Sequence, residues 1–142
     1  MKSLLLIGGT GFLGQSFFDY INTQKLNRLK LSKIIIISKK RKKIISKIKT
    51  SFIVKNISNI KKIPVTDYII YAANSSNNIE NLKGIYNFIK ILKEDHKKTK
   101  ILFTSSGAVY GLGMIKKKFK ENEKINFKKI LKLKGYKKEY AK

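Results

Sequence analysis

A glycine-rich turn that follows an apolar run constrains this chain more than any other feature. Residues 8–14 read Gly-Gly-Thr-Gly-Phe-Leu-Gly, and they come directly after the run at 4–7, Leu-Leu-Leu-Ile. Apolar residues then recur at helical spacing, at Leu13, Phe17, Tyr20 and Ile21. A buried strand, a tight glycine turn and a helix are typical of a parallel sheet that binds the pyrophosphate of a dinucleotide.

The three spaced glycines have separate predicted roles. Gly8 permits the tight turn at the end of the strand, Gly11 lets the backbone approach a pyrophosphate, and Gly14 lets the helix pack close to the strand. The N-terminus of the helix offers free N–H groups and the positive end of its dipole. The alternative is a turn without a ligand, because glycine punctuates many turns. The predicted cofactor contacts in this turn are Gly8, Thr10, Gly11, Phe12, Leu13 and Gly14.

Length and composition exclude several classes of protein. The chain has 142 residues, which is enough for one domain with a core. It has no cysteine, which excludes disulfides, thiol catalysis and cysteine metal sites. No apolar run approaches the length of a membrane span, and no signal-peptide pattern precedes the first strand. These observations predict a soluble, cytoplasmic protein without a membrane partner. The isolated acidic residues predict no metal site.

The net charge of +25 has two possible explanations. Binding of nucleic acid is one, because lysines neutralise phosphates. A genome rich in A and T is the other, since the residues with A/T-rich codons are all abundant: 31 Lys, 23 Ile and 11 Asn. Arginine, the better phosphate ligand, occurs only at Arg28 and Arg41, and the lysines are spread along the chain. We therefore favour the compositional explanation over a dedicated nucleic-acid surface.

The chain alternates strand and helix patterns, which predicts a parallel α/β sheet. After the strand at 4–7, further strands are expected at 34–37, 52–54, 67–73 and 101–103. Helices are expected from residue 12 to about 22 and from about 79 to 95. The second helix has an apolar stripe at Leu82, Ile85, Tyr86, Ile89 and Leu92. Residues 39–49 suggest a basic loop or short helix, residues 116–129 a loop, and residue 130 onwards another helix.

Four segments, in this order, resemble the extended short-chain dehydrogenase/reductase family. They are the turn at 8–14, the strand at 67–73, Asn81-Leu82-Lys83-Gly84, and the segment at 104–111, Thr-Ser-Ser-Gly-Ala-Val-Tyr-Gly. The closest resemblance is to the NAD-dependent epimerase/dehydratase branch. It implies a Rossmann-like, doubly wound parallel sheet that is incomplete at the C-terminus. Residues 1–142 would then be part of an NAD(P)-binding domain, without the carboxy-terminal substrate domain.

The resemblance also implies a catalytic Ser or Thr, a Tyr that transfers a proton, and a Lys four residues after the Tyr. The serine falls on Ser106, and its hydroxyl would hold the substrate oxygen. Tyr140, followed by Ala141, matches the family's Tyr-Ala-x-x-Lys form. A nearby ammonium would lower the pKa of its phenol from about 10 toward the working pH. Tyr86 and Lys90 have the same spacing, but they precede the serine strand, which is the wrong order.

The Lys that Tyr140 requires would be residue 144, and the sequence ends at residue 142. We therefore expect a fragment of a longer protein, which as written should bind its cofactor poorly and have no meaningful turnover. The implied substrate is a small molecule, a nucleotide sugar, and the implied longer protein is a possible homodimer. The alternatives are a non-catalytic NADP-binding regulator and a basic nucleic-acid-binding protein. The presence of both Ser106 and Tyr140 favours the enzyme.

The choice between NAD and NADP rests on the residues after the second strand. NAD-binding folds usually place an acidic residue there, which binds the ribose hydroxyls. Here residues 38–41 are Ser-Lys-Lys-Arg, so the predicted 2′-phosphate contacts of NADP are Ser38, Lys39 and Arg41. NADP is favoured over NAD on this ground.

Five further residues have predicted positions near the cofactor or on the surface. Asn56 lies where the family often has an Asp near the adenine, and Ala72 and Ala73 would pack along the cofactor. Asn81 would form backbone hydrogen bonds that shape the site, or serve the fold alone. His96, the single histidine, is expected to be a solvated surface residue.

Overall fold

The computed structural model describes residues 1–23, 30–105, 120, 122 and 124. The chain divides into two compact units, residues 1–104 and 105–142, and all the helices and strands described below belong to the first. Of the segments predicted beyond residue 105, the structure describes only residues 120, 122 and 124, in the predicted loop.

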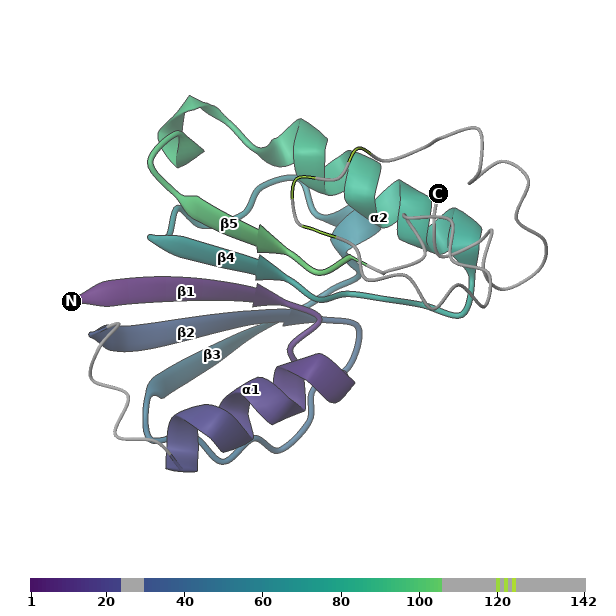
Figure 1. The fold of residues 1–142 in the computed structure, drawn as a ribbon. Coiled ribbons are helices and arrows are strands. Elements are labelled where there is room, and N and C mark those ends of the chain that lie inside the picture. The colour runs from purple at the N-terminus through teal and green to yellow at the C-terminus, as the bar shows by residue number, and fades with distance from the viewer. Residues whose placement is uncertain (24–29, 106–119, 121, 123, 125–142) are drawn as a thin grey trace. The chain divides into compact units, whose positions relative to one another are not determined.

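The first unit contains five parallel strands in the order β3-β2-β1-β4-β5 (Figure 1). The strands are β1 (Lys2–Ile7), β2 (Leu31–Ser38), β3 (Lys49–Val54), β4 (Tyr68–Tyr71) and β5 (Lys100–Phe103). The chain builds outward from β1 to β3 on one side and then returns to place β4 on the other side. This reversal of direction beside β1 is the topological switch point of a doubly wound sheet. The predicted fold class, a Rossmann-like parallel sheet, is confirmed.

The centre of the sheet is buried on both faces because its strands are continuous apolar runs. Residues 4–7 of β1 pair in register with residues 34–37 of β2 on one side and with residues 68–71 of β4 on the other. Leu4 to Ile7 and Ile34 to Ile37 are all buried. A strand that is apolar at every position is typical of a parallel sheet with both faces covered.

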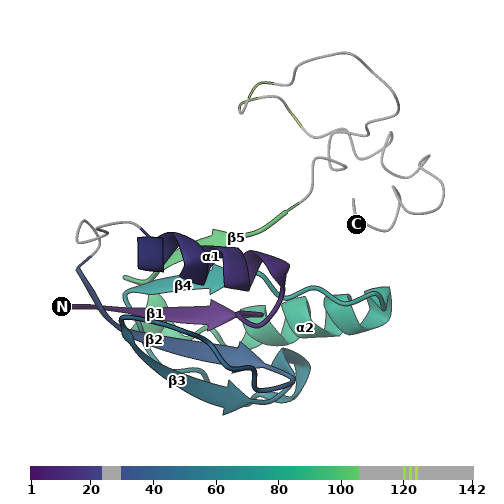
Figure 2. The same ribbon diagram turned by 90° about the horizontal axis from the view of Figure 1, so that it is seen from below.

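Two long helices lie on opposite faces of the sheet (Figures 1 and 2). They are α1 (Phe12–Thr23) and α2 (Asn78–Ile91), with short 3-10 helices η1 (Ile57–Asn59) and η2 (Glu94–His96). Leu4 and Leu6 pack with Phe18 and Ile21 of α1, in one hydrophobic cluster. Leu5 and Ile7 belong to a second cluster with residues 57–63 and with α2. The alternation of side chains along β1 therefore supplies both halves of the core.

The predicted apolar stripe of α2 is confirmed only in part, because Ile85 and Leu92 pack against the core but the other three residues of the stripe are exposed. The buried residues are Gly84, Phe88 and Ile91, whereas Leu82, Tyr86 and Ile89 are 41%, 72% and 60% exposed. The helix carries apolar residues on two faces, so periodicity alone allowed either face to be buried. Gly84 decides between them, because a Cβ there would lie only 3.0 Å from Ile57 Cγ2 and 3.1 Å from the Tyr71 hydroxyl. The glycine lets α2 pack closely against η1 and β4.

The predicted surface position of His96 is also wrong, because the residue is only 7% exposed. The predicted helix to residue 95 ends earlier, at Ile91, and η2 turns the chain back before β5 begins. The Lys93 N–H donates to His96 Nδ1 at 3.2 Å, and the Thr99 N–H donates to the His96 carbonyl at 2.9 Å. Among the described residues, the buried Nε2 of His96 has no hydrogen-bond partner. The packing of this turn against the rest of the fold buries His96, although the neighbouring residues in the sequence are polar.

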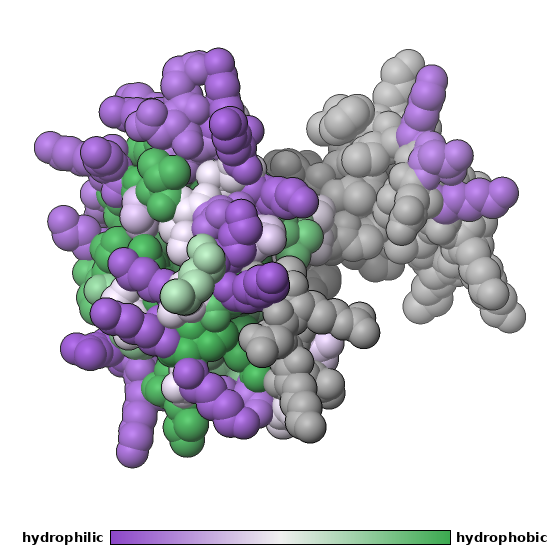
Figure 3. Space-filling model, turned by 90° about the vertical axis from the view of Figure 1, so that its left-hand side faces the viewer, coloured by the Kyte–Doolittle hydropathy of each residue, from purple (hydrophilic) through white to green (hydrophobic). Residues whose placement is uncertain are grey.

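Figure 3 shows one face of the molecule, with hydrophilic side chains projecting at the top, left and bottom and hydrophobic residues between them. On this face the hydrophilic side chains do not gather into one patch. None of the described helices is long and apolar enough to cross a bilayer.

Asp67 joins the start of β4 to the start of β1 and should make the fold sensitive to acid. Its carboxylate accepts hydrogen bonds from Lys2 Nζ at 2.8 Å, the Ser3 N–H at 2.8 Å and Ser3 Oγ at 3.0 Å. These contacts, the Lys2 hydrogen bond first, hold the pKa of Asp67 well below its ordinary value. A depressed pKa stabilises the folded state above the unfolded pKa of about 4, and the stabilisation is lost as pH falls below it.

We therefore expect Asp67→Asn to be less stable than the wild type at pH 6, with the difference shrinking by about pH 2.5. Urea unfolding followed by circular dichroism at the two pH values measures this difference. An equal difference at both pH values would contradict the assignment.

Candidate functional site

The glycine turn connects the end of β1 to the start of α1, at the edge of the sheet where the strands end. The Gly8 N–H donates to the Ile37 carbonyl of β2 at 2.8 Å, and the Gly11 N–H donates to the Gly8 carbonyl at 2.9 Å. The Gln15 N–H donates to the Gly11 carbonyl at 3.0 Å. Gly11 therefore accepts the first hydrogen bond of α1 and occupies its N-cap position.

Two of the predicted glycine roles correspond to close backbone contacts. Gly8 has φ of +85°, and a Cβ there would lie 2.6 Å from both Cα and N of Ala73. A Cβ on Gly14 would lie 2.4 Å from Cα of Gly9, so the helix packs against the turn itself. Both contacts are with backbone atoms, which cannot rotate away. The sequence at 8–14 therefore folds into one closely packed turn.

Gly11 differs from the other two glycines because space beside it remains open. A Cβ on Gly11 would meet only the Gly8 carbonyl oxygen, at 3.3 Å, and its φ is not positive. No acidic residue lies in the first turn of α1. The first N–H groups of a helix have no partner within the helix, and they carry its positive dipole end. These residues therefore fit a bound anion such as a pyrophosphate.

Apolar side chains flank the open turn. Phe12 and Leu13 are 85% and 51% exposed at the start of α1, although both are large and apolar. Thr10 is half-buried, and its carbonyl accepts a long 3.5 Å hydrogen bond from Gln15 Nε2. Exposed apolar residues beside free N–H groups can contact a ligand that has both a phosphate and a flat ring. A cofactor role for these three residues remains a proposal.

β4 ends at Tyr71, and the small residues Ala72 and Ala73 follow it beside the turn. The Ala72 N–H donates to the Ile7 carbonyl at 2.8 Å, and Ala73 lies next to Gly8. Asn81 of α2 holds the loop that follows: its Oδ1 accepts from the Ser75 N–H and its Nδ2 donates to the Ser75 carbonyl, both at 2.7 Å. The predicted backbone hydrogen bonds of Asn81 are thus present.

The predicted 2′-phosphate residues lie at the end of β2 and just beyond it, and each already has a partner. Ser38 is buried, and its Oγ donates to the Lys40 carbonyl at 2.6 Å. The guanidinium carbon of Arg41 lies 5.4 Å from the centre of the Phe52 ring, within the range of a cation–π contact. Lys39 forms an ion pair with Glu80 at 2.6 Å between Nζ and Oε1. Sequence reasoning did not identify these partners.

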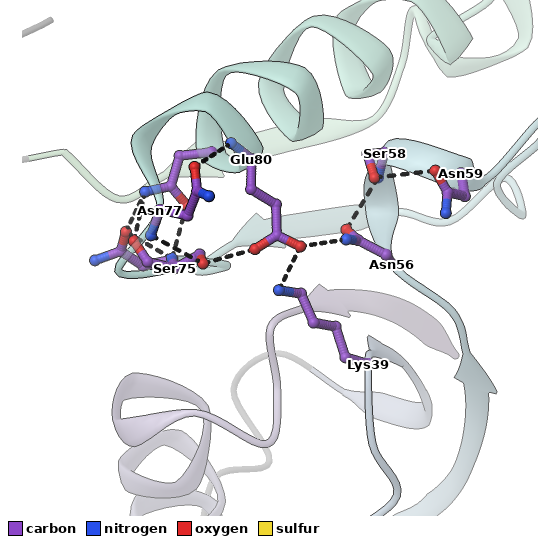
Figure 4. Close-up of polar contacts among 9 residues, drawn as sticks. Lys39, Asn56, Ser58, Asn59, Ser75, Asn77 and Glu80 are labelled. Atoms are coloured by element: carbon purple, nitrogen blue, oxygen red, sulfur yellow. Dashed lines mark hydrogen bonds and ion pairs between the residues drawn. The ribbon is translucent and has the colours of Figure 1, made fainter.

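Glu80 of α2 joins the ends of three strands (Figure 4). Besides Lys39, its Oε1 accepts from Asn56 Nδ2 at 2.6 Å, and its Oε2 accepts from Ser75 Oγ at 2.7 Å. The hydrogen bond from Lys39 contributes most to lowering the pKa of Glu80 to about 2, followed by that from Ser75. Glu80 is therefore ionised at neutral pH.

Asn56 has a local role besides its bond to Glu80. Its Oδ1 accepts from the Ser58 N–H at 3.2 Å and caps η1 (Figure 4). Asn56 follows β3, as predicted, and lies near the cationic segment 39–41 that follows β2. The predicted contact with an adenine stays a prediction.

Glu80 is the residue of this region that sequence reasoning missed. It is the only acidic residue between Asp67 and Glu94, and Asn77 lies three residues before it. That spacing resembles a helix N-terminus signature, and the Glu80 N–H does donate to Asn77 Oδ1 at 3.2 Å. The carboxylate extends instead to Lys39, just beyond the end of β2. Only the folded arrangement of β2 beside α2 brings this pair together.

The predicted catalytic residues Ser106 and Tyr140 lie outside the described residues. Thr104, at the end of β5, is described: its N–H and its Oγ both donate to the Tyr71 carbonyl at 3.0 Å. Burial raises the pKa of Tyr71 to about 12, and its ring stacks on Phe103 with centroids 5.0 Å apart. Thr104 and Tyr71 thus fasten the end of β5 to β4. No cluster of three metal-ligating side chains occurs among the described residues.

No protein-family model and no curated protein sequence matches this chain. Solved structures do match. One is a candidate NADH-flavin reductase from Streptococcus pneumoniae, with a TM-score of 0.62 and 17% identity over 99% of this chain and 63% of its own. Another is a UDP-galactose 4-epimerase, with a TM-score of 0.58 and 19% identity over 80% of this chain and 41% of its own.

A third is the Bordetella bronchiseptica enzyme WbmG in complex with NAD, with a TM-score of 0.55 and 16% identity over 78% of this chain and 39% of its own. At such identities the likeness shows a shared fold. This chain spans less than two thirds of each of these proteins.

Proposed function

We propose that this chain binds a nicotinamide dinucleotide and is the cofactor-binding portion of an epimerase, dehydratase or reductase that acts on a nucleotide sugar. The observation that carries the proposal is the turn after β1. Its backbone is closely packed at Gly8 and Gly14 but open at Gly11, beside a helix N-terminus without an acidic residue. The solved structures of the same fold include an NADH-flavin reductase candidate and an enzyme in complex with NAD, which supports the choice of ligand.

We propose NADP as the dinucleotide, with the 2′-phosphate directed toward the end of β2. Lys39, Lys40 and Arg41 follow Ser38 there, and no acidic residue belongs to that segment. The pyrophosphate would lie at the N–H groups that begin α1, and Asn56 is the proposed adenine contact. Ala72 and Ala73, whose backbone packs closely against Gly8, are the proposed contacts along the cofactor.

The proposed chemistry is hydride transfer, which the nicotinamide ring supplies when it is bound. Ser106 would hold the substrate oxygen by a hydrogen bond, and Tyr140 would take or give the hydroxyl proton. A positively charged neighbour favours the phenolate form and lowers the pKa of a tyrosine. The sugar substrate and a homodimer of the longer protein remain part of this proposal.

A titration of the purified 142-residue chain with NAD and with NADP tests the proposal. We expect saturable binding with a Kd of about 0.1–1 mM, measured by calorimetry or ligand-observed NMR. Because the chain has a net charge of +25, tripolyphosphate and random duplex DNA serve as controls for general attraction to anions. The titrations are repeated at about 0.3 M salt, where general attraction is strongly screened. The proposal would be refuted if neither dinucleotide showed saturable binding. It would also be refuted if tripolyphosphate bound as tightly as the dinucleotides.

A further inference from the structure

A carboxylate lies beside the end of β2 although the sequence has no acidic residue there. Dinucleotide-binding folds use an Asp or Glu at this place to bind the ribose hydroxyls of NAD, and a cation to accept the 2′-phosphate of NADP. Here the segment at 38–41 supplies only cations and a hydroxyl. Glu80 comes from α2, 41 residues after Lys39, and pairs with it at 2.6 Å. Figure 4 shows the two side chains extending toward each other from different elements.

Hydrogen bonds fix the position of the ionised Glu80 carboxylate. Asn56 Nδ2 and Ser75 Oγ each donate to it, at 2.6 and 2.7 Å, so donors from the ends of β2, β3 and β4 fix its position. Its side chain is 30% exposed and that of Lys39 is 52% exposed, so a ligand can reach the pair. A phosphate that approaches Lys39 therefore meets a fixed negative charge beside the ammonium group.

We propose that Glu80 is a specificity-determining residue that limits the preference of this site for NADP over NAD. By pairing with Lys39, its carboxylate competes with the 2′-phosphate for the ammonium group and repels that phosphate directly. NAD has a hydroxyl at the same place and is not repelled. The inference rests on the proposed dinucleotide binding and adds a residue to it that lies outside the segment after β2.

The test compares the Kd values of NAD and NADP for the wild type, Glu80→Gln, Lys39→Gln and the double variant. Glutamine keeps the size of Glu80 and can still bond to Ser75 and Asn56, so the fold should be retained. We expect Glu80→Gln to strengthen NADP binding about fivefold to twentyfold and to change NAD binding less than about threefold. The gain should be absent when Lys39→Gln is present as well, because the ammonium group that attracts the 2′-phosphate is then missing.

Asp67→Asn is the matched control, because it removes the same charge from an ion-paired carboxylate at the edge of the sheet where β1 begins. It should leave the ratio of the two Kd values unchanged. An equal gain in Asp67→Asn would show that net charge alone is responsible and would overturn the inference. The inference would also be overturned if the ratio of the two Kd values in Glu80→Gln stayed within about twofold of the wild-type ratio. The same holds if the gain in NADP binding persisted in the double variant.

A second measurement does not depend on the cofactor. Because Lys39 is the main cause of the lowered pKa of Glu80, Lys39→Gln should raise that pKa toward its ordinary range in an NMR titration of the carboxyl. An unchanged pKa would mean that the ion pair is absent in solution and would overturn the inference. If the wild type binds neither dinucleotide, the proposed function fails. If the wild type binds NAD but Glu80→Gln leaves the ratio of the NAD and NADP Kd values unchanged, only the proposed role of Glu80 fails.

Discussion

Replacing Gly8 with alanine should strongly destabilise the fold. Its φ of +85° lies in the left-handed region, which costs an alanine about 1–2 kcal/mol. The added Cβ would lie 2.6 Å from Cα and N of Ala73 and 2.7 Å from the carbonyl carbon of Ala72. Overpacking of this kind costs about 1–3 kcal/mol more, because backbone atoms of β1 and β4 must separate. The sum is a large part of the about 5–15 kcal/mol that holds a small domain folded.

Urea unfolding followed by circular dichroism measures the loss, with Gly11→Ala as the control in the same turn. A Cβ at Gly11 meets only one carbonyl oxygen, at 3.3 Å, and its φ is not positive, so its unfolding midpoint should fall only slightly, because alanine is a poorer N-cap residue than glycine. A Gly8→Ala midpoint equally close to the wild type would mean that the turn is looser than its contacts indicate.

The fold could be predicted from the sequence because its strongest signals are local. The apolar runs at 4–7 and 34–37 and the glycine turn between strand and helix each depend on neighbouring residues, and all three were located correctly. The buried face of α2 was located only in part, because the helix has apolar residues on both sides. Gly84 buries one side through contacts with Ile57 and Tyr71, which are distant in sequence.

The candidate site also has a part that could be predicted from local sequence and a part that could not. The roles of Gly8 and Gly14 follow from steric rules that apply to any such turn, and the structure has the close contacts that those rules require. The partners of Ser38, Lys39 and Arg41 could not be predicted, since they depend on which segments the fold brings to one edge. The ion pair of Lys39 with Glu80 needs β2, α2 and the loop after β4 to be in place together.

The second large expected effect is on dinucleotide binding. Gly11→Asp should abolish this binding while the fold is retained. Gly11 occupies the N-cap position of α1, where aspartate is among the preferred residues. The new carboxylate would also face the positive end of the helix dipole, so the helix itself should be unharmed or slightly more stable. The same charge would lie next to the N–H groups that are proposed to bind the pyrophosphate. At about 6 Å and an effective dielectric constant of about 20, two like charges repel by about 3 kcal/mol.

A loss of about 3 kcal/mol corresponds to a Kd about 100-fold weaker, which places dinucleotide binding beyond the measurable range for this chain. Gly11→Asn is the matched control: it has nearly the same shape and is also a good N-cap, but it adds no charge. It should weaken binding less than about tenfold, and both variants should unfold at urea concentrations close to the wild type. Undiminished NAD or NADP binding by a folded Gly11→Asp chain would mean that the dinucleotide binds elsewhere, since a pyrophosphate at the start of α1 could not tolerate that charge.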